Sequence, residues 1–581
     1  MSKVLKDIYW QFAELTGYRY WHLQDTHQNW YVQTLVELQP GKTAEDLQQW
    51  FKAQNPTQLG FVSRHYRSLP HRFCAAWIAR GALSELPADL IVRFKLGLPT
   101  NPNAFYPLEA FRVLQGQRLK NRFVRNSSAL GVPANEVIGI IDDGIQTTGF
   151  LGTGSPRLMA SWDQNSLTSS GSVAPRFGYS LLSAVPIPKP VAVSHGTLVA
   201  SIAAGAITPQ YRSRQTLRPL PAKVDAASIA PVMTVQLRQD TVVDTSGGAL
   251  AVNVLDGLHF MLANLPTQAK LAVNISFGTM AGAHDGTSIL ESAMAELVDA
   301  MAGRLEIVLP AGNSRQAQAH ARFELHPNTS RELIWRVLPD DRTPSYVEIW
   351  GSLDAKFEVT LTSPDGRHSI AGVSGSGAAE LKSGSTVIGA LIANDQPASS
   401  MTKQVVLVAL APTRTVGAPR APHGDWKIRI KNTGANNADI DAWIERDNAS
   451  FGQKSKGRQS YFVEPNRTRQ PQAKPTALPP SVVAEEGTLN GIGTGSGITV
   501  VGGYRLSDGQ AAAYSGLGSS RVRPPDTHAP SDESALLRGI LGSSNSGCGV
   551  ARLSGTSAAA PWHTREIVNQ WVALTNAAAR P

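Results

Sequence analysis

The spacing of apolar residues changes along the chain and predicts regions of different architecture. In the first region, residues 32–38 (VQTLVEL) form an apolar run typical of a strand, and Thr43-Ala-Glu-Asp46 has the Ser/Thr-x-x-acid form of a helix N-terminus before LQQWFKA. Two further strand-like runs, a short helical segment (GALSEL) and a last strand ending at Leu96 follow. The resulting order β-α-β-β-α-β is the ferredoxin-like pattern.

From residue 137 the pattern becomes that of an α/β fold. Residues 137–141 (VIGII) form a fully apolar strand, and a helix with apolar residues at helical spacing extends from Leu290 to Met301 and stops before Gly303. The apolar strand LEIVLP comes next. Strands that alternate with helices predict a parallel sheet, and fully apolar strands predict that helices cover both of its faces.

Between residues 321 and 447 the apolar period becomes two. Phe357, Val359 and Leu361 alternate with polar residues, and a Pro-Asp-Gly turn follows. We expect an all-β domain here, most simply a sandwich. Residues 448–480 are rich in Gln, Lys, Arg, Ser and Pro and predict an exposed connection, after which the α/β pattern returns with ITVVGGY.

The composition is that of a soluble globular protein. The 581 residues are 42% hydrophobic and 17% charged, which excludes disordered and fibrous classes. Polar or charged residues interrupt every apolar stretch before it reaches the 18 residues of a membrane span, and the N-terminus lacks the apolar core of a signal peptide. We therefore expect a cytoplasmic protein without a membrane partner.

The net charge and the cysteine content indicate which partners and which kinds of site to expect. The 54 Lys and Arg against 45 Asp and Glu give a net charge of +9, but the basic residues are scattered, so a nucleic-acid partner is the weaker interpretation. Cys74 and Cys548 lie far apart in the sequence and form neither a disulfide framework nor a CxxC metal motif. The sequence predicts reduced thiols and no metal bound by cysteines.

Three short segments carry the residue types of a nucleophilic triad. They are residues 137–144 (VIGIIDDG), 194–205 (SHGTLVASIAAG) and 553–561 (LSGTSAAAP). A serine hydroxyl needs an imidazole to take its proton, and the imidazole needs a carboxylate to fix its tautomer. Ser557 at a helix start, His195 ahead of a helix and Asp142 at a strand end supply these three roles. Asn313 of the loop Pro310-Ala-Gly-Asn313 offers a side-chain amide that stabilises an oxyanion.

These segments together resemble the motifs of the subtilisin-like serine proteases. IDDG, HGT, PAGN and GTSAAAP match the family's Asp, His, oxyanion and Ser motifs, and the chain order Asp, His, Ser is that of subtilisin. The segment Ser276, Phe277 and Gly278 is similar to the family segment that pairs with the substrate backbone and lines the S1 pocket. The resemblance covers roughly residues 137–313 and 482–562.

The resemblance implies a subtilisin-like parallel sheet flanked by helices. It also implies that the N-terminal ferredoxin-like unit, about residues 30–98, acts like the family's inhibitory propeptides; an ordinary accessory domain is the alternative. We expect five parts along the chain: an N-terminal region over 1–130, a first catalytic part over 131–320, an inserted β-sandwich over 321–447, the connection over 448–480, and a second catalytic part over 481–581.

The β insertion lengthens the distance between two motifs. Asn313 and Ser557 are 557 − 313 = 244 positions apart, several times the family's spacing, and the insertion accounts for most of the excess. The segments GDWKIRIKNTG and IDAWIERD resemble the jelly-roll-like domains of some subtilases, including clostridial germination proteases. That resemblance implies a role in rigidity, with sugar or substrate binding as the alternative.

One position near the triad departs from the family pattern. Asp143 stands where a Ser or Thr is usual, so the sequence leaves open which of Asp142 and Asp143 contacts His195; Asp142 occupies the motif position. The preference of the S1 pocket also stays open, as does structural calcium.

The resulting prediction is a serine endopeptidase that acts on proteins or peptides through an acyl-enzyme on Ser557. Its chemistry requires no cofactor. The N-terminal domain is a further expected partner, as inhibitor or chaperone. A catalytically silent relative that serves as a binding or regulatory protein is the alternative.

Overall fold

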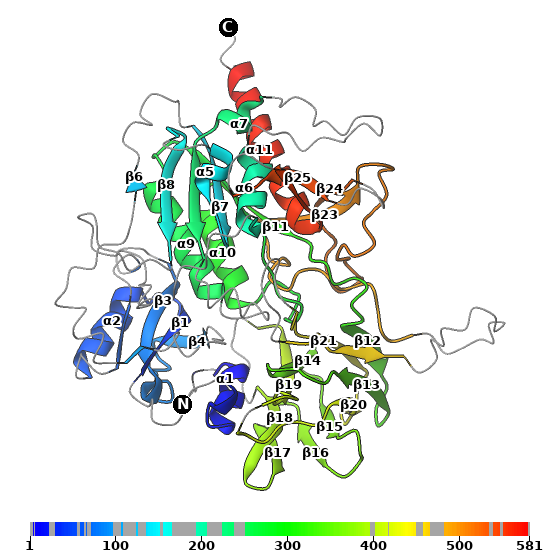
Figure 1. Cartoon of the computed structure of the whole chain (residues 1–581). Helices are drawn as coiled ribbons and strands as arrows, with labels where there is room; N and C mark the ends of the chain where they lie inside the picture. The colour runs from blue at the N-terminus through cyan, green and yellow to red at the C-terminus, as the bar shows by residue number, and fades with distance from the viewer. Residues whose placement is uncertain are drawn as a thin grey trace.

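The computed structural model describes most of the chain. The described residues are 4, 6–21, 30–54, 59–62, 66, 71–96, 106–107, 124–125, 135–151, 155–164, 193–205, 224–237, 250–394, 401–415, 417–448, 457–464, 481–533, 539–545 and 550–578. Figure 1 shows three bodies: a helix-flanked sheet, an N-terminal α+β unit and a β-rich part at the bottom of the view.

An eight-stranded sheet forms the centre of the molecule. Its spatial order is β24-β23-β11-β10-β7-β9-β8-β6, and all neighbouring pairs are parallel except β6 with β8. The strands are β6 (Val124–Arg125), β7 (Glu136–Asp142), β8 (Leu158–Asp163), β9 (Val232–Gln236), β10 (Lys270–Ile275), β11 (Leu305–Pro310), β23 (Ile498–Arg505) and β24 (Thr527–Asp532). The parallel sheet predicted from the alternation of strands with helices is confirmed.

Helices cover both faces of this sheet. Val137 and Ile141 of β7 belong to the apolar cluster of α9 and α10, whereas Ile138 and Ile140 belong to the cluster of α6 and α11, because alternate residues of a strand face opposite sides. The helices are α5 (Thr147–Leu151), α6 (His195–Ala204), α7 (Ala226–Ile229), α9 (Leu250–Asn264), α10 (Ile289–Ala300) and α11 (Thr556–Ala578).

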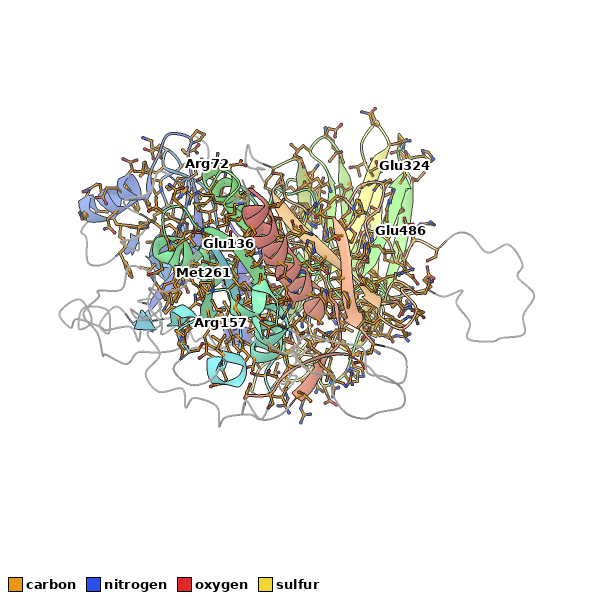
Figure 2. The ribbon with its side chains drawn as sticks, turned by 90° about the horizontal axis from the view of Figure 1, so that it is seen from above. Arg72, Glu136, Arg157, Met261, Glu324 and Glu486 are labelled. Carbon is orange, nitrogen blue, oxygen red and sulfur yellow. The ribbon has the colours of Figure 1, made fainter. Side chains whose placement is uncertain are left out.

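The longest helix, α11, lies along the sheet. Figure 2 shows it beside Glu136 at the start of β7, and the Thr575 hydroxyl donates a hydrogen bond of 3.0 Å to the Glu136 carboxylate. The hairpin of β25 (Ile540–Ser543) and β26 (Val550–Leu553) immediately precedes α11. None of the helices in the described part of the chain is long and apolar enough to cross a membrane.

The N-terminal unit has an antiparallel sheet in the order β2-β3-β1-β4, with β5 also pairing with β1. Its elements are α1 (Ile8–Leu15), η1 (Arg19–Trp21), β1 (Trp30–Leu38), α2 (Ala44–Ala53), β2 (Gly60–Val62), β3 (Phe73–Ala79), η3 (Arg80–Ala82), β4 (Ile91–Leu96) and β5 (Tyr106–Pro107). The capping box of Thr43 and Asp46 at α2 is confirmed. The predicted helix GALSEL is wrong, since only the short 3₁₀ turn η3 forms there.

The β insertion consists of two antiparallel sheets that share one apolar core. One sheet has the order β12-β21-β14-β19-β18-β17 and the other β16-β15-β20-β13-β22. The strands are β12 (His320–Leu325), β13 (Ser330–Val337), β14 (Ser345–Ser352), β15 (Phe357–Thr362), β16 (Ser369–Val373), β17 (Ala378–Ser383), β18 (Thr386–Ala393), β19 (Lys403–Leu410), β20 (Gly424–Asn432), β21 (Ala438–Ile444) and β22 (Tyr461–Val463). Trp335, Phe357 and Trp426 are fully buried between the sheets.

The prediction of an exposed connection over 448–480 is wrong where the structure describes that segment. Residues 461–463 form β22, which pairs with β13 and places Phe462 fully buried in the core of the insertion. The polar residues around this short apolar run conceal it in the composition. Residues 449–456 and 465–480 lie outside the described part.

Helix α1 covers the outer face of the first sheet of the insertion. In β19, Val406 and Val408 face the core of the insertion, whereas Val405 and Leu407 face the cluster that includes α1. The Tyr9 hydroxyl of α1 donates a hydrogen bond of 2.5 Å to the Glu348 carboxylate. The N-terminal region therefore contacts the insertion as well as the helices of the central sheet (Figure 1).

Candidate active site

The sheet topology brings the predicted site residues to one edge. β11, β10 and β7 are parallel neighbours, so their carboxyl ends meet at the same edge of the sheet. Asp142 ends β7, Ser276 directly follows β10, and Asn313 follows β11 by three positions. α6 begins with His195 and α11 carries Ser557 in its first turn.

The structure answers which carboxylate contacts the histidine. His195 Nδ1 lies 2.7 Å from Asp142 Oδ1 and 4.0 Å from Asp143 Oδ1. Asp142 is fully buried, and its Oδ1 also accepts the backbone N–H of Asp143 at 2.7 Å. Asp142 therefore orients the imidazole, and Asp143 is a second, more distant negative charge.

The charges around His195 determine its protonation. Burial alone lowers the pKa of His195, but the charge and hydrogen bond of Asp142, with a smaller contribution from Asp143, outweigh it, so the pKa is raised above the usual value of 6.5. The positive charge of Arg446 acts in the opposite direction. The carboxylates of Asp142 and Asp143 therefore make the His195 imidazole a stronger base.

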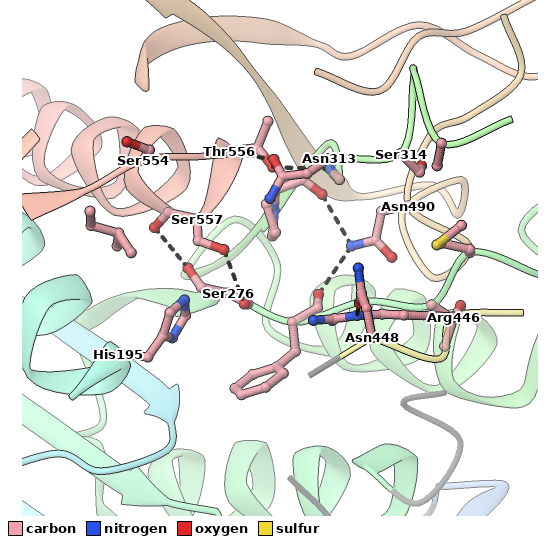
Figure 3. Close-up of a pocket in the computed structure, with 18 of the residues that line it drawn as sticks. His195, Ser276, Asn313, Ser314, Arg446, Asn448, Asn490, Ser554, Thr556 and Ser557 are labelled. Atoms are coloured by element: carbon pink, nitrogen blue, oxygen red, sulfur yellow. Dashed lines mark hydrogen bonds between the residues drawn. The ribbon is translucent and has the colours of Figure 1, made fainter. Parts of the chain in front are cut away.

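Figure 3 shows Ser557 and His195 at the same side of the pocket, beside Ser276. The Ser557 hydroxyl donates to the Ser276 carbonyl at 3.5 Å, and the Ser276 hydroxyl donates to the Ser557 carbonyl at 3.3 Å. These two bonds connect the start of α11 with the end of β10. The backbone N–H groups of a first helical turn lack partners within the helix, so that of Ser557 is available to an anion.

Asn313 is held by the residue that precedes the serine. Its Oδ1 accepts the backbone N–H and the hydroxyl of Thr556, both at 3.0 Å, and the Thr556 hydroxyl in turn accepts the N–H of Gly312 at 3.1 Å. With the amide oxygen engaged, the NH₂ end is the part that can donate. Thr556 was not predicted, although its place beside Ser557 was a usable signal.

A pocket of about 310 Å³ adjoins these residues. One wall is the backbone from Ser276 to Met280, and the other includes Pro310 and Asn313. Asn490 connects the walls, because its Nδ2 donates to the carbonyls of Phe277 at 3.0 Å and Pro310 at 3.1 Å.

The predicted residues Phe277 and Gly278 both line this pocket. The Phe277 ring lies 5.8 Å from the His195 ring, centre to centre. A Cβ at Gly278 would collide with the Asn490 amide, which explains a glycine there. Asn490 was not predicted; its only signal is its place in the glycine-rich stretch GTLNGIG.

The insertion also supplies residues to the pocket. Arg446, just after β21, lines it together with Asn448 and Gln459, and Arg446 Nε donates to Asn448 Oδ1 at 2.8 Å. From the sequence, Arg446 was expected at the end of the β-sandwich and the other two in an exposed connection. Nothing in the local sequence indicates that these residues approach Ser557.

A metal would compete with the Asp142–His195 hydrogen bond for the same atoms. Among the described residues, the group whose ligand atoms lie close enough to hold an ion is Asp142, Asp143 and His195, all buried. His195 Nδ1 already pairs with Asp142 Oδ1 at 2.7 Å. The arrangement suits proton transfer between a carboxylate-supported imidazole and a neighbouring hydroxyl.

Comparisons with known proteins identify a similar fold. No family model and no curated protein sequence matches this chain. Among solved structures, the CspB protease of Clostridium perfringens is similar with a TM-score of 0.55 and 18% identity, over 76% of this chain and 84% of that chain. The fold of this chain is therefore like that of a protease.

Two further solved structures show a weaker likeness. They are the epidermin leader peptide processing serine protease EpiP of Staphylococcus aureus, with a TM-score of 0.35 and 11% identity over 93% of this chain and 87% of that chain, and an S41 psychrophilic protease, with a TM-score of 0.29 and 12% identity over 76% and 78%.

Proposed function

We propose that this chain is a subtilisin-like serine endopeptidase with the triad Asp142, His195 and Ser557. The observation that carries the proposal is the buried 2.7 Å hydrogen bond between Asp142 and His195 at the edge of a pocket that also presents Ser557 and Asn313. A carboxylate-oriented imidazole, a hydroxyl and an amide donor around one cavity are the parts that acyl transfer needs.

The first half of the reaction forms the acyl-enzyme. Ser557 Oγ turns from the Ser276 carbonyl towards His195 Nε2, which takes its proton while Oγ bonds to the carbonyl carbon of the substrate. Asp142 stabilises the imidazolium that forms, and the Asn313 amide and Ser557 N–H donate to the oxyanion. The C–N bond then breaks, and His195 gives its proton to the leaving amine.

The second half regenerates the enzyme. Water gives a proton to His195 and attacks the acyl carbon, and the proton returns to Ser557 Oγ as the acid product leaves. Asp142 keeps accepting the hydrogen bond from His195 Nδ1 in both halves.

The N-terminal sheet acts in this proposal as an inhibitor or folding chaperone bound to α9 and α10. Its contacts support the assignment: the Tyr66 hydroxyl donates to Asp256 Oδ1 at 2.7 Å, and Arg93 donates to the Thr287 carbonyl at 2.7 Å. These same contacts favour the second candidate, a silent relative that keeps this domain bound and serves as a binding protein.

Labelling with a fluorophosphonate tests the proposal, because the reagent phosphonylates an activated serine. Intact mass of the full chain should show one adduct that disappears in Ser557→Ala and persists in the matched control Ser554→Ala, which changes another serine of the pocket. The same spectrum shows whether the N-terminal domain has been cut off. A full-length protein that stays unlabelled even after brief trimming of this domain would support the silent relative instead.

A further inference from the structure

The side chain of Asn490 lies between the two walls of the pocket beside the proposed nucleophile. We propose that Asn490 makes this protein select substrates with a small P1 side chain, that of the residue whose carbonyl is attacked. Glycine, alanine or serine fits at P1, whereas leucine or phenylalanine meets the Asn490 amide. The inference rests on the proposed function and assigns Asn490 a part in substrate choice.

The position of Asn490 relative to the reacting atoms is the first argument. One wall of the pocket begins at Ser276, whose carbonyl accepts the Ser557 hydroxyl at 3.5 Å, and the other wall includes Asn313. A P1 side chain next to a carbonyl held by Ser557 and Asn313 therefore enters the space between the walls. Figure 3 shows the Asn490 amide in that space, with a hydrogen bond to each wall.

The backbone of residues 490–491 joins the same two walls. The N–H of Asn490 donates to the Ala311 carbonyl at 2.8 Å, and the N–H of Gly491 donates to the Thr279 carbonyl at 3.0 Å. Together with the two hydrogen bonds of the Asn490 amide, each wall receives one backbone and one side-chain hydrogen bond. Residues 490–491 thus form a floor that is fixed to both walls of the pocket.

The Asn490 amide is held in one orientation. Its side chain is buried, and the two hydrogens of Nδ2 are donated to the carbonyls of Phe277 and Pro310. Its Oδ1 accepts the N–H of Ile492 at 3.2 Å. A large P1 side chain that displaced the amide would break three hydrogen bonds and take this donor away from two buried carbonyls, which is unfavourable.

The contact with Gly278 shows that the floor leaves no spare space. A Cβ at Gly278 would lie 2.1 Å from Asn490 Oδ1, so the amide already packs against the backbone of this wall. The volume of about 310 Å³ belongs to the whole pocket, whose lining also includes Met280 and residues of the insertion. The depth available to a P1 side chain is therefore set by the floor and not by that volume.

Peptidyl diphenyl phosphonates test the inference, since they react with an activated serine and carry a chosen P1 side chain. We would measure the labelling rate of the full chain with otherwise identical reagents that carry Ala, Leu or Phe at P1. These side chains are all apolar and differ in size, so we expect Ala to react about tenfold faster than Leu, and Phe slowest.

Variants assign the preference to Asn490. Asn490→Gly removes the amide and should raise the rate of the Phe reagent about tenfold relative to that of the Ala reagent. Fluorophosphonate labelling, which needs no P1 side chain, shows whether the site of the variant is still assembled.

Asn432→Gly, at the end of β20, is the matched control. Asn432 is buried as well, and its Nδ2 donates to two carbonyls, those of Leu325 at 2.9 Å and Asn436 at 2.7 Å. Its Oδ1 also accepts the N–H two positions along the chain, that of Gly434, at 2.8 Å. The control loses the same kind of hydrogen bonds away from the pocket and should keep the preference for Ala.

Separate outcomes overturn the inference and the proposed function. A Leu or Phe reagent as fast as the Ala reagent in the unaltered chain, with normal fluorophosphonate labelling, would refute the role of Asn490 and leave the protease standing, even if the variants failed to fold. An unchanged ratio of rates in an Asn490→Gly protein that still reacts with the fluorophosphonate would refute that role too. Absence of labelling by every reagent, also after trimming of the N-terminal domain, would refute the proposed function and this inference with it.

Discussion

The buried carboxylate of Glu445 accepts the backbone N–H of Met280 at 3.2 Å. The same oxygen accepts the N–H of Arg446 at 2.7 Å. The end of β21 in the insertion is thereby joined to the wall of the pocket beside Ser557. Burial and the nearby Glu348 charge raise the pKa of Glu445 to about 8. The strength of this contact between β21 and the pocket wall therefore depends on pH.

Glu445→Gln should remove that dependence. The folded protein binds this proton more tightly than the unfolded chain, whose ordinary value is 4.5, so the group's contribution to stability is complete below pH 4.5 and is lost as the pH rises through about 8. Each pH unit between these values changes the free energy of unfolding by up to about 1.4 kcal/mol. Glutamine keeps the accepting oxygen without ionising. We expect a higher Tm than the unaltered chain at pH 8.5 and a similar Tm at pH 5. The same difference at both pH values would contradict this reasoning.

Two substitutions should shift the pH dependence of labelling in opposite directions. The proposed mechanism needs neutral His195, whose pKa Asp143 raises and Arg446 lowers. Asp143→Asn should therefore move the acid limb of the labelling rate to lower pH, and Arg446→Gln should move it to higher pH. Fluorophosphonate labelling rates between pH 5 and 9 measure the acid limb in both variants. The reagent itself carries no charged side chain. Shifts of the same sign in both variants would show that another group controls the limb.

The support of Asn313 by Thr556 predicts a graded loss of turnover. Asn313→Ala removes the amide donor and should lower kcat by about 10²–10³ with little change in KM. Thr556→Ala leaves the amide but removes one of the two bonds to its oxygen, and should lower kcat by about tenfold. Thr556→Ser keeps the hydroxyl and serves as the control that should restore activity. A KM effect without a kcat effect would assign Asn313 to substrate binding.

The buried hydrogen bond between Tyr66 and Asp256 connects the N-terminal unit to α9, and its removal should lower the free energy of unfolding. Tyr66→Phe removes the hydroxyl that donates to Asp256 Oδ1 at 2.7 Å and leaves a buried carboxyl with one donor fewer. The free energy of unfolding should fall by about 1–3 kcal/mol, as measured by denaturant unfolding. Tyr504→Phe on β23, whose ring is half-buried, is the matched control. An equal loss in both variants would show that the bond to Asp256 adds nothing specific.

The parts of the site that lie beside strand ends were predictable from sequence. Asp142 and Ser276 follow apolar strands, and parallel neighbours bring such positions to one edge whatever the loops do. His195 and Ser557 begin helices at that edge, so local motifs were sufficient to place them.

The contribution of the insertion was not predictable in this way. Arg446 reaches the pocket because Glu445 bonds to Met280, 165 positions away in the chain. Such a contact depends on the path of a whole domain rather than on a local pattern. The burial of Phe462 was not predictable either. Its strand β22 pairs with β13, but the polar residues around β22 give the segment the composition of an exposed connection.

The place of α11 in the chain affects how the protein is made. The strands of the central sheet that the structure describes, and both sheets of the insertion, precede Ser557 in the sequence. Synthesis runs from the N-terminus, and domains generally fold as they emerge. A ribosome therefore releases the N-terminal sheet and the pocket walls before the proposed nucleophile exists. Under the proposed function, a growing chain cannot bring Asp142, His195 and Ser557 together to cut its neighbours on the same messenger until α11 has been made.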